Sequence, residues 1–447
     1  MYYTKNDFKV ILCTLLFIFI LIPAFSENQV EQALMNLKPG ESTEVDIYTV
    51  INVEDKFYHL FDGTSANKPG IHVDEAGKTT DLNNTSDMYI MLGKKKAILI
   101  DLSNYHPEST AALRDIFLTL AGNRQKIIAV THSHPDHVGQ FSAFADVPGI
   151  TFLISNEDKP GLAAYAEAFH LDLSRFTGFE PGMQIDLGGR KLDTVPVTGH
   201  TPGSVVFLDV RNKTGFSGDA VGSGSGVWLF GSFESYKAGV TNLIKTLDKF
   251  HLKDVTLYGG HSSWQQGTVK LNRQYLNDML TDISTVAQGK FTADYLGFEH
   301  RGLNSNIAYG TAIITVGRGK AIKYAMDNGV TYNPYTDISE QTPHYDAIIF
   351  CAMTEIFRGT EWTRFEPDKP LTGIQLTSTL AAINGTPIKK ENGDEPLDGN
   401  QADEIIADFA KTNGLKLPAD ILFSEKGNPT RAEAAVVIRA IYNSLTK

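Results

Sequence analysis

The stretch Thr131-His132-Ser133-His134-Pro135-Asp136-His137-Val138-Gly139 places three imidazoles and a carboxylate within six consecutive residues. It follows the apolar run Ile127-Ile128-Ala129-Val130, which predicts a buried β-strand. Ligands of open α/β sheets bind beyond the carboxyl ends of the strands, so this turn lies where a site is expected. Imidazoles and carboxylates bind divalent transition metals, and the stretch holds enough of them to serve two ions. Three of the 12 histidines fall here, which favours ligands over ordinary surface residues.

Further candidate ligands follow downstream, each after a segment with β-strand character. His200 lies in a loop marked by Gly and Pro, within Thr198-Gly199-His200-Thr201-Pro202-Gly203-Ser204. Asp219 lies in Ser217-Gly218-Asp219-Ala220, after a predicted strand from Ser204 to Asp209 and its turn. His261 ends the apolar segment Val255-Thr256-Leu257-Tyr258-Gly259-Gly260-His261. Together with the first stretch they make seven ligands, which predicts two metal ions.

This ordered set of motifs resembles the metallo-β-lactamase-fold hydrolases. The matching patterns are HxHxDH, a lone His in TGHTPGS, then SGDA and a final GGH. The resemblance runs from about Glu44 to about Gly289, with Tyr335 as a wider limit. It implies an αββα fold, with one zinc ion on His132, His134 and His200, a second on Asp136, His137 and His261, and Asp219 bridging the two. It also places Asp101 close to the site, although Leu102-Ser103 stands where the family normally has a nearby Gly.

The ligand set predicts hydrolysis by a metal-bound hydroxide. Two zinc ions lower the pKa of a shared water and polarise the scissile bond, and Asp136 would orient the hydroxide as the catalytic carboxylate. No Gly-x-Ser-x-Gly nucleophile elbow follows a predicted strand. His134 differs from the Glu of iron-type relatives, and Asp219 differs from the Cys or Ser of most true β-lactamases. We therefore expect a small ester, thioester, lactone or phosphodiester as substrate.

Two other functions remain open from the sequence. One is hydrolysis of β-lactams, and the other is a non-catalytic, metal-stabilised protein that binds at the cell surface. Trp228, Leu229 and Phe230 follow Asp219 closely, and either a substrate wall or plain core packing would account for them. His106 is the remaining histidine nearest to a predicted strand end.

The predicted elements are those of an α/β protein, an αββα sandwich with a small, mostly helical C-terminal repeat module. The segments 89–92 and 97–100 predict a β-hairpin, and 111–121, 236–250 and 269–287 have helical spacing. The segment 307–324 returns to β character. At 447 residues and 42% hydrophobic composition, the chain is long enough for two or more domains.

The N-terminus predicts export. Lys5 and Lys9 precede an apolar stretch from Val10 to Phe25, and polar residues follow Ser26, as in a secretory signal peptide. A retained membrane anchor is the alternative, although the stretch is slightly short for a span. Cleavage would leave Cys351 as the single cysteine and no stable membrane span. The formal net charge of −12 argues against nucleic acid as a partner.

The C-terminal third contains two similar segments. Phe365, Thr372 and Ile383 align with Phe423, Thr430 and Ile441 at one constant offset. The segments resemble S-layer homology repeats, most clearly at Asn428-Pro429-Thr430-Arg431-Ala432-Glu433. That resemblance implies a cell-wall polysaccharide bound through Arg431. The first segment lacks the basic motif, and usually three repeats assemble, so a helical appendage that packs on the hydrolase or dimerises is the alternative.

We therefore divide the chain into a signal peptide (1–26), a hydrolase domain (27–336) and two repeats (337–447). The expected location is outside the cell, with retention at the cell wall. On this interpretation, truncation after Thr336 would leave hydrolysis intact and abolish binding to the wall.

Overall fold

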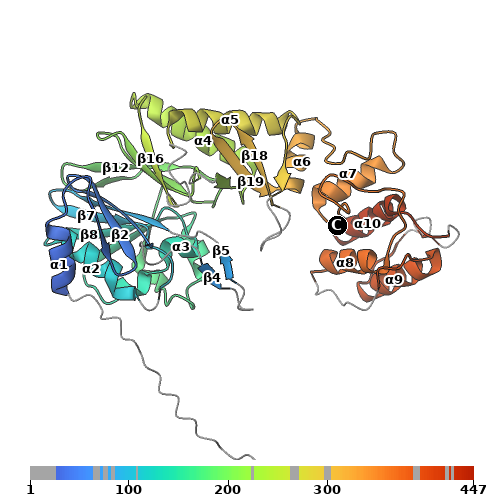
Figure 1. Ribbon diagram of the computed structural model, residues 1–447, viewed down its shortest axis with the longest axis horizontal. Helices are drawn as coiled ribbons and strands as arrows, with labels where there is room; N and C mark the ends of the chain where they lie inside the picture. The colour runs from blue at the N-terminus through green and yellow to red at the C-terminus, as the bar shows by residue number, and fades with distance from the viewer. Residues whose placement is uncertain are drawn as a thin grey trace, which may run out of the picture.

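The computed structural model describes residues 27–63, 71–73, 79–81, 86–106, 109–222, 226–261, 271–295, 304–385, 393–417, 422–423 and 427–446. The predicted signal peptide lies outside these ranges. Two β-sheets lie face to face in the N-terminal part of the molecule, with helices on their outer sides (Figure 1). The predicted αββα arrangement is therefore confirmed.

The first sheet has the strand order β1-β2-β3-β6-β7-β8-β9-β10. Its strands are Ser42–Val45, Tyr48–Glu54, Phe57–Phe61, Asp87–Leu92, Lys96–Ile100, Gln125–Ala129, Ile150–Ser155 and Phe176–Phe179. The predicted hairpin is formed by β6 and β7, which pair antiparallel, whereas β7, β8 and β9 run parallel. Helices α1 (Glu27–Met35) and α2 (Thr110–Ala121) pack against each other beside this sheet. A small hairpin, β4 (Ile71–Val73) with β5 (Thr79–Asp81), stands apart from it.

The second sheet has the strand order β11-β12-β13-β14-β16. Its strands are Gln184–Asp186, Lys191–Pro196, Val205–Asp209, Thr214–Gly218 and Thr256–Gly259. Helices α4 (Phe233–Lys249) and α5 (Arg273–Ala287) cover its outer side, as their predicted spacing required. A further sheet of order β15-β19-β18-β17 packs on α5; its strands are Val227–Trp228, Ala312–Gly317, Asn304–Tyr309 and Asp294–Tyr295.

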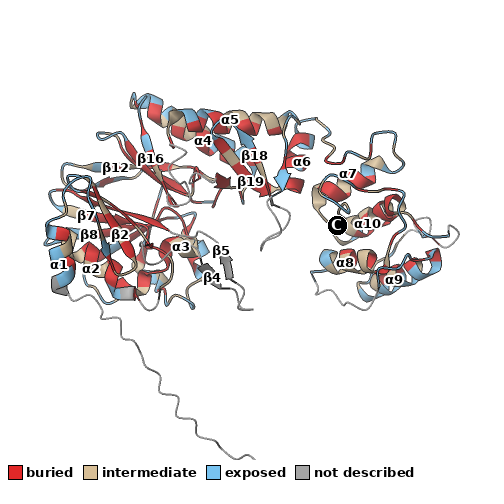
Figure 2. Cartoon of the chain, viewed as in Figure 1, coloured by how far each residue is buried: buried red, intermediate tan, exposed pale blue. Residues whose placement is uncertain are grey.

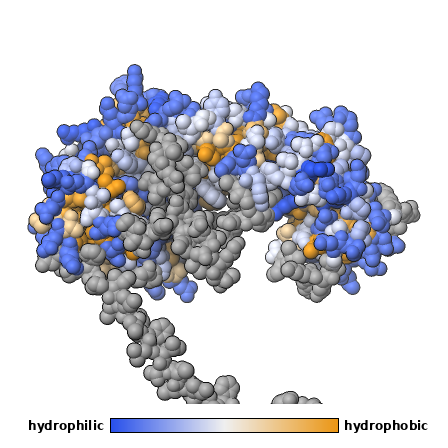
Figure 3. All heavy atoms as spheres, viewed as in Figure 1, coloured by the Kyte–Doolittle hydropathy of each residue, from blue (hydrophilic) through white to orange (hydrophobic). Residues whose placement is uncertain are grey.

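Three layers of buried apolar residues explain why the sheets stack. One joins α1 and α2 to the first sheet, with Leu113 and Leu99 among its members. The second lies between the sheets and includes Phe57 and Phe207. The third joins the second sheet to α4 and α5. Figure 2 shows the buried residues along the strands and inner helix faces, and in Figure 3 hydrophilic side chains cover most of the described surface on this side.

The β prediction for 307–324 is correct only in its first part. β18 and β19 form the expected strand pair, but Arg318–Asp327 is helix α6. Arg318, Ala321, Ile322 and Ala325 are buried, and they recur at the spacing of one helix face. The strand prediction was therefore wrong for this part, whose spacing is that of a helix.

The C-terminal part is helical. Its helices are α7 (Tyr345–Thr354), α8 (Gly373–Ile383), α9 (Gly399–Thr412) and α10 (Arg431–Leu445). Capping boxes begin α8, α9 and α10, at Thr372, Asp398 and Thr430. We call these helices, with the segments that join them, the C-terminal module. Its core includes Phe365 and Phe423, which occupy equivalent places in the two sequence segments, and also Ile322 from α6.

Arg431 does not lie at the surface where a polysaccharide could reach it. Its side chain is only 2% exposed. Its Nε donates to the carbonyl of Phe365 at 2.9 Å, and Nη2 donates to the carbonyl of Arg358 at 2.6 Å. The guanidinium also lies 4.7 Å from the ring centre of Phe357. Because the side chain is buried and donates to two carbonyls inside the module, Arg431 has a structural role, and the predicted wall contact through it is not supported.

The core between the second sheet and its helices contains a carboxyl group. Asp282 of α5 is fully buried, and neither carboxylate oxygen makes a hydrogen bond within the described residues. Burial raises the pKa of Asp282 to about 7. The folded state therefore holds a proton that the unfolded state releases at much lower pH, and stability falls as pH rises through 7.

We expect Asp282→Asn to stabilise the protein at pH 8 by a few kcal/mol, since each pKa unit corresponds to about 1.4 kcal/mol. At pH 5 the gain should be smaller, because the folded carboxyl keeps its proton there and only the unfolded state is ionised. Denaturant unfolding at both pH values measures the change in the free energy of unfolding. Asp248→Asn, at an exposed position, is the control. An equal gain at both pH values would show that charge is not the cause.

Within the described residues, no helix combines the length and the apolar character that crossing a membrane requires.

Candidate metal centre

The seven predicted ligands come from the ends of strands that meet at one edge of the sandwich. β7 and β8 run parallel in the first sheet, and β14 and β16 run parallel in the second, so their following loops emerge together. β8 leads to His132 and to the short helix α3 (Pro135–Val138). β14 ends immediately before Asp219, and β16 ends two residues before His261. His200 follows β12.

Two glycines allow this close approach. A Cβ atom on Gly260 would lie 2.3 Å from Oδ1 of Asp219 and 2.7 Å from Cε1 of His137. Gly218 has a φ of +46°, and a Cβ atom there would meet the Thr131 side chain at 2.2 Å. Gly260 is therefore required by the packing of two ligands, and Gly218 by its positive φ and its contact with Thr131.

His132, His134 and His200 form one candidate site. Nδ1 of His134 lies 3.1 Å from Nε2 of His132 and 2.8 Å from Nε2 of His200. His132 and His200 are buried, and His134 is half-buried. Three ring nitrogens converge here. Each neutral imidazole carries only one N–H, so these nitrogens cannot all be paired by hydrogen bonds to one another.

The other ligands gather beside this triad. Nε2 of His261 lies 3.4 Å from Oδ2 of Asp136 and 3.2 Å from Oδ2 of Asp219. Asp219 also approaches the first triad, with Oδ2 3.5 Å from Nε2 of His200. Its Oδ1 lies 3.7 Å from Nε2 of His137. Asp219 thus stands between the two sets, in the place that a bridging ligand requires.

Three of the histidines also make a contact through Nδ1, the ring nitrogen that faces away from the cluster. Nδ1 of His137 contacts Oδ2 of Asp101 at 2.9 Å. Nδ1 of His132 contacts the Thr131 hydroxyl at 3.1 Å, and Nδ1 of His200 contacts the carbonyl of Trp228 at 2.8 Å. Such contacts fix the tautomer, so that Nε2 faces the centre.

Asp101 takes the supporting position despite the missing glycine. It accepts the backbone N–H of Thr131 at 2.7 Å and the Thr131 hydroxyl at 2.8 Å. Asp101 and Ser103 both adopt left-handed backbone conformations, with φ of +63° and +59°. The chain therefore makes this turn without glycine, at some cost in strain.

Asp158 is a supporting residue that the sequence did not reveal. It is buried, and it accepts the N–H of Ser133 at 2.6 Å, the hydroxyl of Thr201 at 2.9 Å and the N–H of Gly203 at 2.8 Å. It thereby connects the loop of His132 and His134 with the loop of His200. Its neighbours Asn156 and Glu157 carry no metal-ligand spacing, so no motif signalled it.

The electrostatics of the cluster suit metal binding. Burial lowers the pKa of His132 and His200, and lowers that of His134 to about 4, so their lone pairs are free of protons. Burial also disfavours protonation of His137, but Asp101, Asp136 and Asp219 outweigh it and raise its pKa to about 9. Among the described residues, the buried Nε2 of His137 has no hydrogen-bond partner. A cation would satisfy this atom and the converging nitrogens, and the mixed imidazole and carboxylate set fits zinc.

Zinc binding at pH 7 should release protons. The metal-free protein keeps His137 protonated below pH 9, and His261 likewise has a raised pKa because Asp219 and Asp136 outweigh its burial. We expect about one to two protons per chain at pH 7 and fewer at pH 9. Calorimetric titrations with zinc, in buffers that differ in ionisation enthalpy, measure the number. Asp101→Asn should reduce it, and an enthalpy independent of the buffer would contradict the expectation.

The aromatic segment after Asp219 is divided between the core and the site. Leu229 is buried in the core, whereas Phe230 is 42% exposed. The Phe230 ring lies 5.6 Å from that of His134 and 5.3 Å from that of His200. Phe230 therefore forms an apolar wall beside the first triad. His106 instead contacts Asp62 at 3.0 Å and belongs to neither group of candidate ligands.

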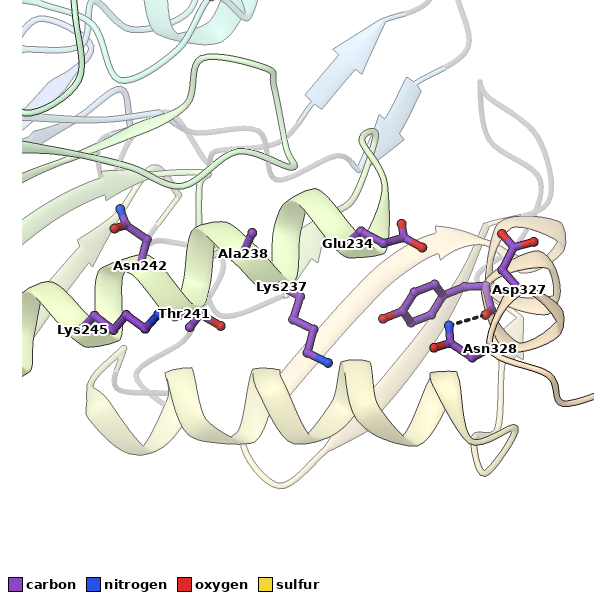
Figure 4. Close-up of a pocket in the computed structure, with 9 residues that line it drawn as sticks. Glu234, Lys237, Ala238, Thr241, Asn242, Lys245, Asp327 and Asn328 are labelled. Atoms are coloured by element: carbon purple, nitrogen blue, oxygen red, sulfur yellow. Dashed lines mark hydrogen bonds between the residues drawn. The ribbon is translucent and has the colours of Figure 1, made fainter.

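A groove of about 630 Å³ lies elsewhere, between α4 and α6 (Figure 4). Its lining includes Glu234, Lys237, Lys245 and Asp327, and none of the seven ligands. Charges of both signs line it, so it favours no particular ligand.

One family model matches the part of the chain that contains the candidate ligands. Residues 83–261 match the family described as Metallo-beta-lactamase superfamily. The fold of that superfamily is confirmed. The matched range contains all seven candidate ligands.

Individual relatives are distant. The chain is 25% identical to hydroxyacylglutathione hydrolase GloC of Haemophilus influenzae over 197 residues, which cover 41% of this chain and 89% of the relative. It is 32% identical to the uncharacterized protein YobT of Bacillus subtilis over 120 residues, which cover 24% of this chain and 51% of that protein. A metallo-beta-lactamase structure from Pontibacter korlensis is 19% identical, covers 53% of this chain and 98% of its own, and has a TM-score of 0.39.

Proposed function

We propose that this protein is a dinuclear zinc hydrolase of small acyl substrates, with thioesters as the first class to test. The observation that carries the proposal is the convergence of five imidazoles and two carboxylates, in which Asp219 lies close to both His200 and His261. Within the part of the chain that the structure describes, every one of these groups lies at the carboxyl-end edge of the sandwich. This is where α/β folds bind ligands.

The residues of the centre would have separate roles in metal binding, in orienting the water and in contacting the substrate. His132, His134 and His200 would hold one ion, Asp136, His137 and His261 the other, and Asp219 both. Zinc in such a centre lowers the pKa of a water and polarises the bond to be broken. Asp136 would accept a hydrogen bond from the attacking water and orient it. Phe230 would exclude solvent from one side of the acyl group and favour apolar substituents there.

Thioesters are placed first because of one relative. The Haemophilus protein is named for hydrolysis of a hydroxyacylglutathione, which is a thioester, and the match covers most of its length. Esters, lactones and phosphodiesters present similar oxygens to the same metals. The chain has Asp219 where most true β-lactamases have Cys or Ser, which supports β-lactams least.

The decisive experiment is hydrolysis of a panel: acyl thioesters including hydroxyacylglutathiones, activated esters, lactones, bis-phosphodiesters and a chromogenic β-lactam. Each is tested with the zinc-loaded protein and after chelation. We expect chelator-sensitive turnover, highest for thioesters. If the β-lactam alone is hydrolysed, β-lactams replace thioesters as the proposed substrate class. No turnover of any substrate by protein with two bound zinc ions would support the non-catalytic surface protein instead.

We also propose that the protein is exported. The support is the sequence of the N-terminus, where Lys5 and Lys9 precede the apolar stretch. Expression of the full chain, followed by mass spectrometry of the secreted and cell-associated fractions, tests it. A mature protein that begins near Glu27 in the medium or on the cell surface is expected. A full-length chain found only inside the cell would contradict export.

A further inference from the structure

Lys320 makes an unusual set of contacts near the centre. It lies in α6, and its ammonium donates to three consecutive carbonyls: Leu229 at 3.2 Å, Phe230 at 2.8 Å and Gly231 at 3.1 Å. These acceptors use all three donors of the ammonium. The contacts join residues about ninety positions apart in the sequence, so they are a tertiary feature of this chain.

The segment that Lys320 holds, residues 228–231, supports His200 from two sides. The carbonyl of Trp228 contacts Nδ1 of His200 at 2.8 Å. The N–H of Gly231 donates to the carbonyl of Gly199, the residue before His200, at 2.7 Å. Phe230, between these two contacts, presents its ring to His134 and His200. A shift of this segment would therefore move a ligand and the aromatic wall together.

The C-terminal module holds the beginning of α6 in place. Oε1 of Glu355 accepts the backbone N–H of Gly319 at 2.7 Å. Arg318 donates to the carbonyl of Trp362, and its guanidinium lies 3.9 Å from a ring centre of Trp362. Nε1 of Trp362 in turn donates to the carbonyl of Ala293 at 2.8 Å. The two residues that precede Lys320 are thus held by the module.

We propose that Lys320 is a positioning residue that fixes the 228–231 segment against His200, and that the C-terminal module acts on the metal centre through it. The inference rests on the proposed metal centre and not on the identity of the substrate. It assigns the module a function inside the molecule that does not depend on any external partner.

The test compares Lys320→Met with Lys323→Met in the full-length protein. Lys323 lies on the same helix, is exposed and pairs with Asp327, so its loss should change little. We expect Lys320→Met to weaken zinc binding about tenfold in competition with a chelator, and to change the visible absorption of the cobalt-substituted protein. Lys323→Met should stay within about twofold of wild type in both measurements. Both readouts are independent of hydrolysis, so failure of the proposed function would not mask the result.

A wild-type zinc affinity and cobalt spectrum in Lys320→Met would overturn the proposal. If circular dichroism shows that this variant does not fold, Lys320→Gln takes its place, since its shorter amide keeps some hydrogen bonding. We then expect an intermediate loss of affinity, and wild-type values would again overturn the proposal. Glu355→Gln removes only the charge beside α6, and a smaller change in the cobalt spectrum is expected from it.

Discussion

Asp219→Ala should reduce hydrolysis by about a thousandfold or more and should weaken zinc binding at both sites. The physical reason is the position of this carboxylate, which lies 3.5 Å from Nε2 of His200 in one group and 3.2 Å from Nε2 of His261 in the other. Its removal also takes away one of the two carboxylates among the seven candidate ligands. Steady-state kinetics on the best substrate of the panel and zinc analysis by mass spectrometry check both parts.

Two variants make this prediction specific. His261→Ala should mainly empty the second site, so about one zinc ion should remain after dialysis, whereas Asp219→Ala should retain less. Asp55→Ala is the control, because its carboxylate is 81% exposed and should not affect either measurement. One tightly held ion in wild-type protein, with no gain on zinc addition, would be incompatible with the dinuclear assignment.

The candidate ligands could be predicted because they occur in short, recognisable sequence motifs. His132 and His137 are close in sequence, and His200 and His261 are marked by glycines that the packing requires. Parallel strands bring such loops to one edge, so their convergence followed from the topology. The supporting residues were not predictable in this way. Asp158 and Lys320 act through backbone atoms of distant loops, and a carboxylate or ammonium that binds backbone leaves no pattern in its neighbours.

For Arg431 the sequence motif was recognised, but the buried environment of its side chain could not be predicted. Thr430 and Glu433 form a capping box at the start of α10, and Arg431 is the first residue of this helix. The guanidinium nevertheless points into the module, where two carbonyls and the rings of Phe357 and Phe365 surround it. Arginine can be satisfied either by an external anion or by internal carbonyls, and sequence alone does not separate the two. Burial decides between them.

Truncation after Thr336 is the second large effect. The sequence predicted that hydrolysis would stay intact, whereas the contacts of α6 with the module lead us to expect losses of stability and of zinc affinity. Removing the C-terminal module would expose Ile322 of α6, which is fully buried in the module's core. It would also remove Glu355 and Trp362, which hold the start of α6. We expect the thermal unfolding temperature to fall by about 10 °C, since a loss of several kcal/mol shifts it by a few degrees per kcal/mol. Zinc affinity should fall about tenfold as Lys320 loses its support.

Trp362→Leu in the full-length chain tests whether the contacts made by the module matter, because the module itself is still present. This variant keeps every helix but removes the hydrogen bond to Ala293 and the face on which Arg318 stacks. It should lower the unfolding temperature by roughly half as much as truncation and should shift the cobalt spectrum in the same direction. Calorimetry and absorption spectroscopy measure both. A truncated protein with the unfolding temperature and zinc affinity of the full chain would instead establish the module as an independent appendage, because the contacts through α6 would then contribute nothing to the metal centre.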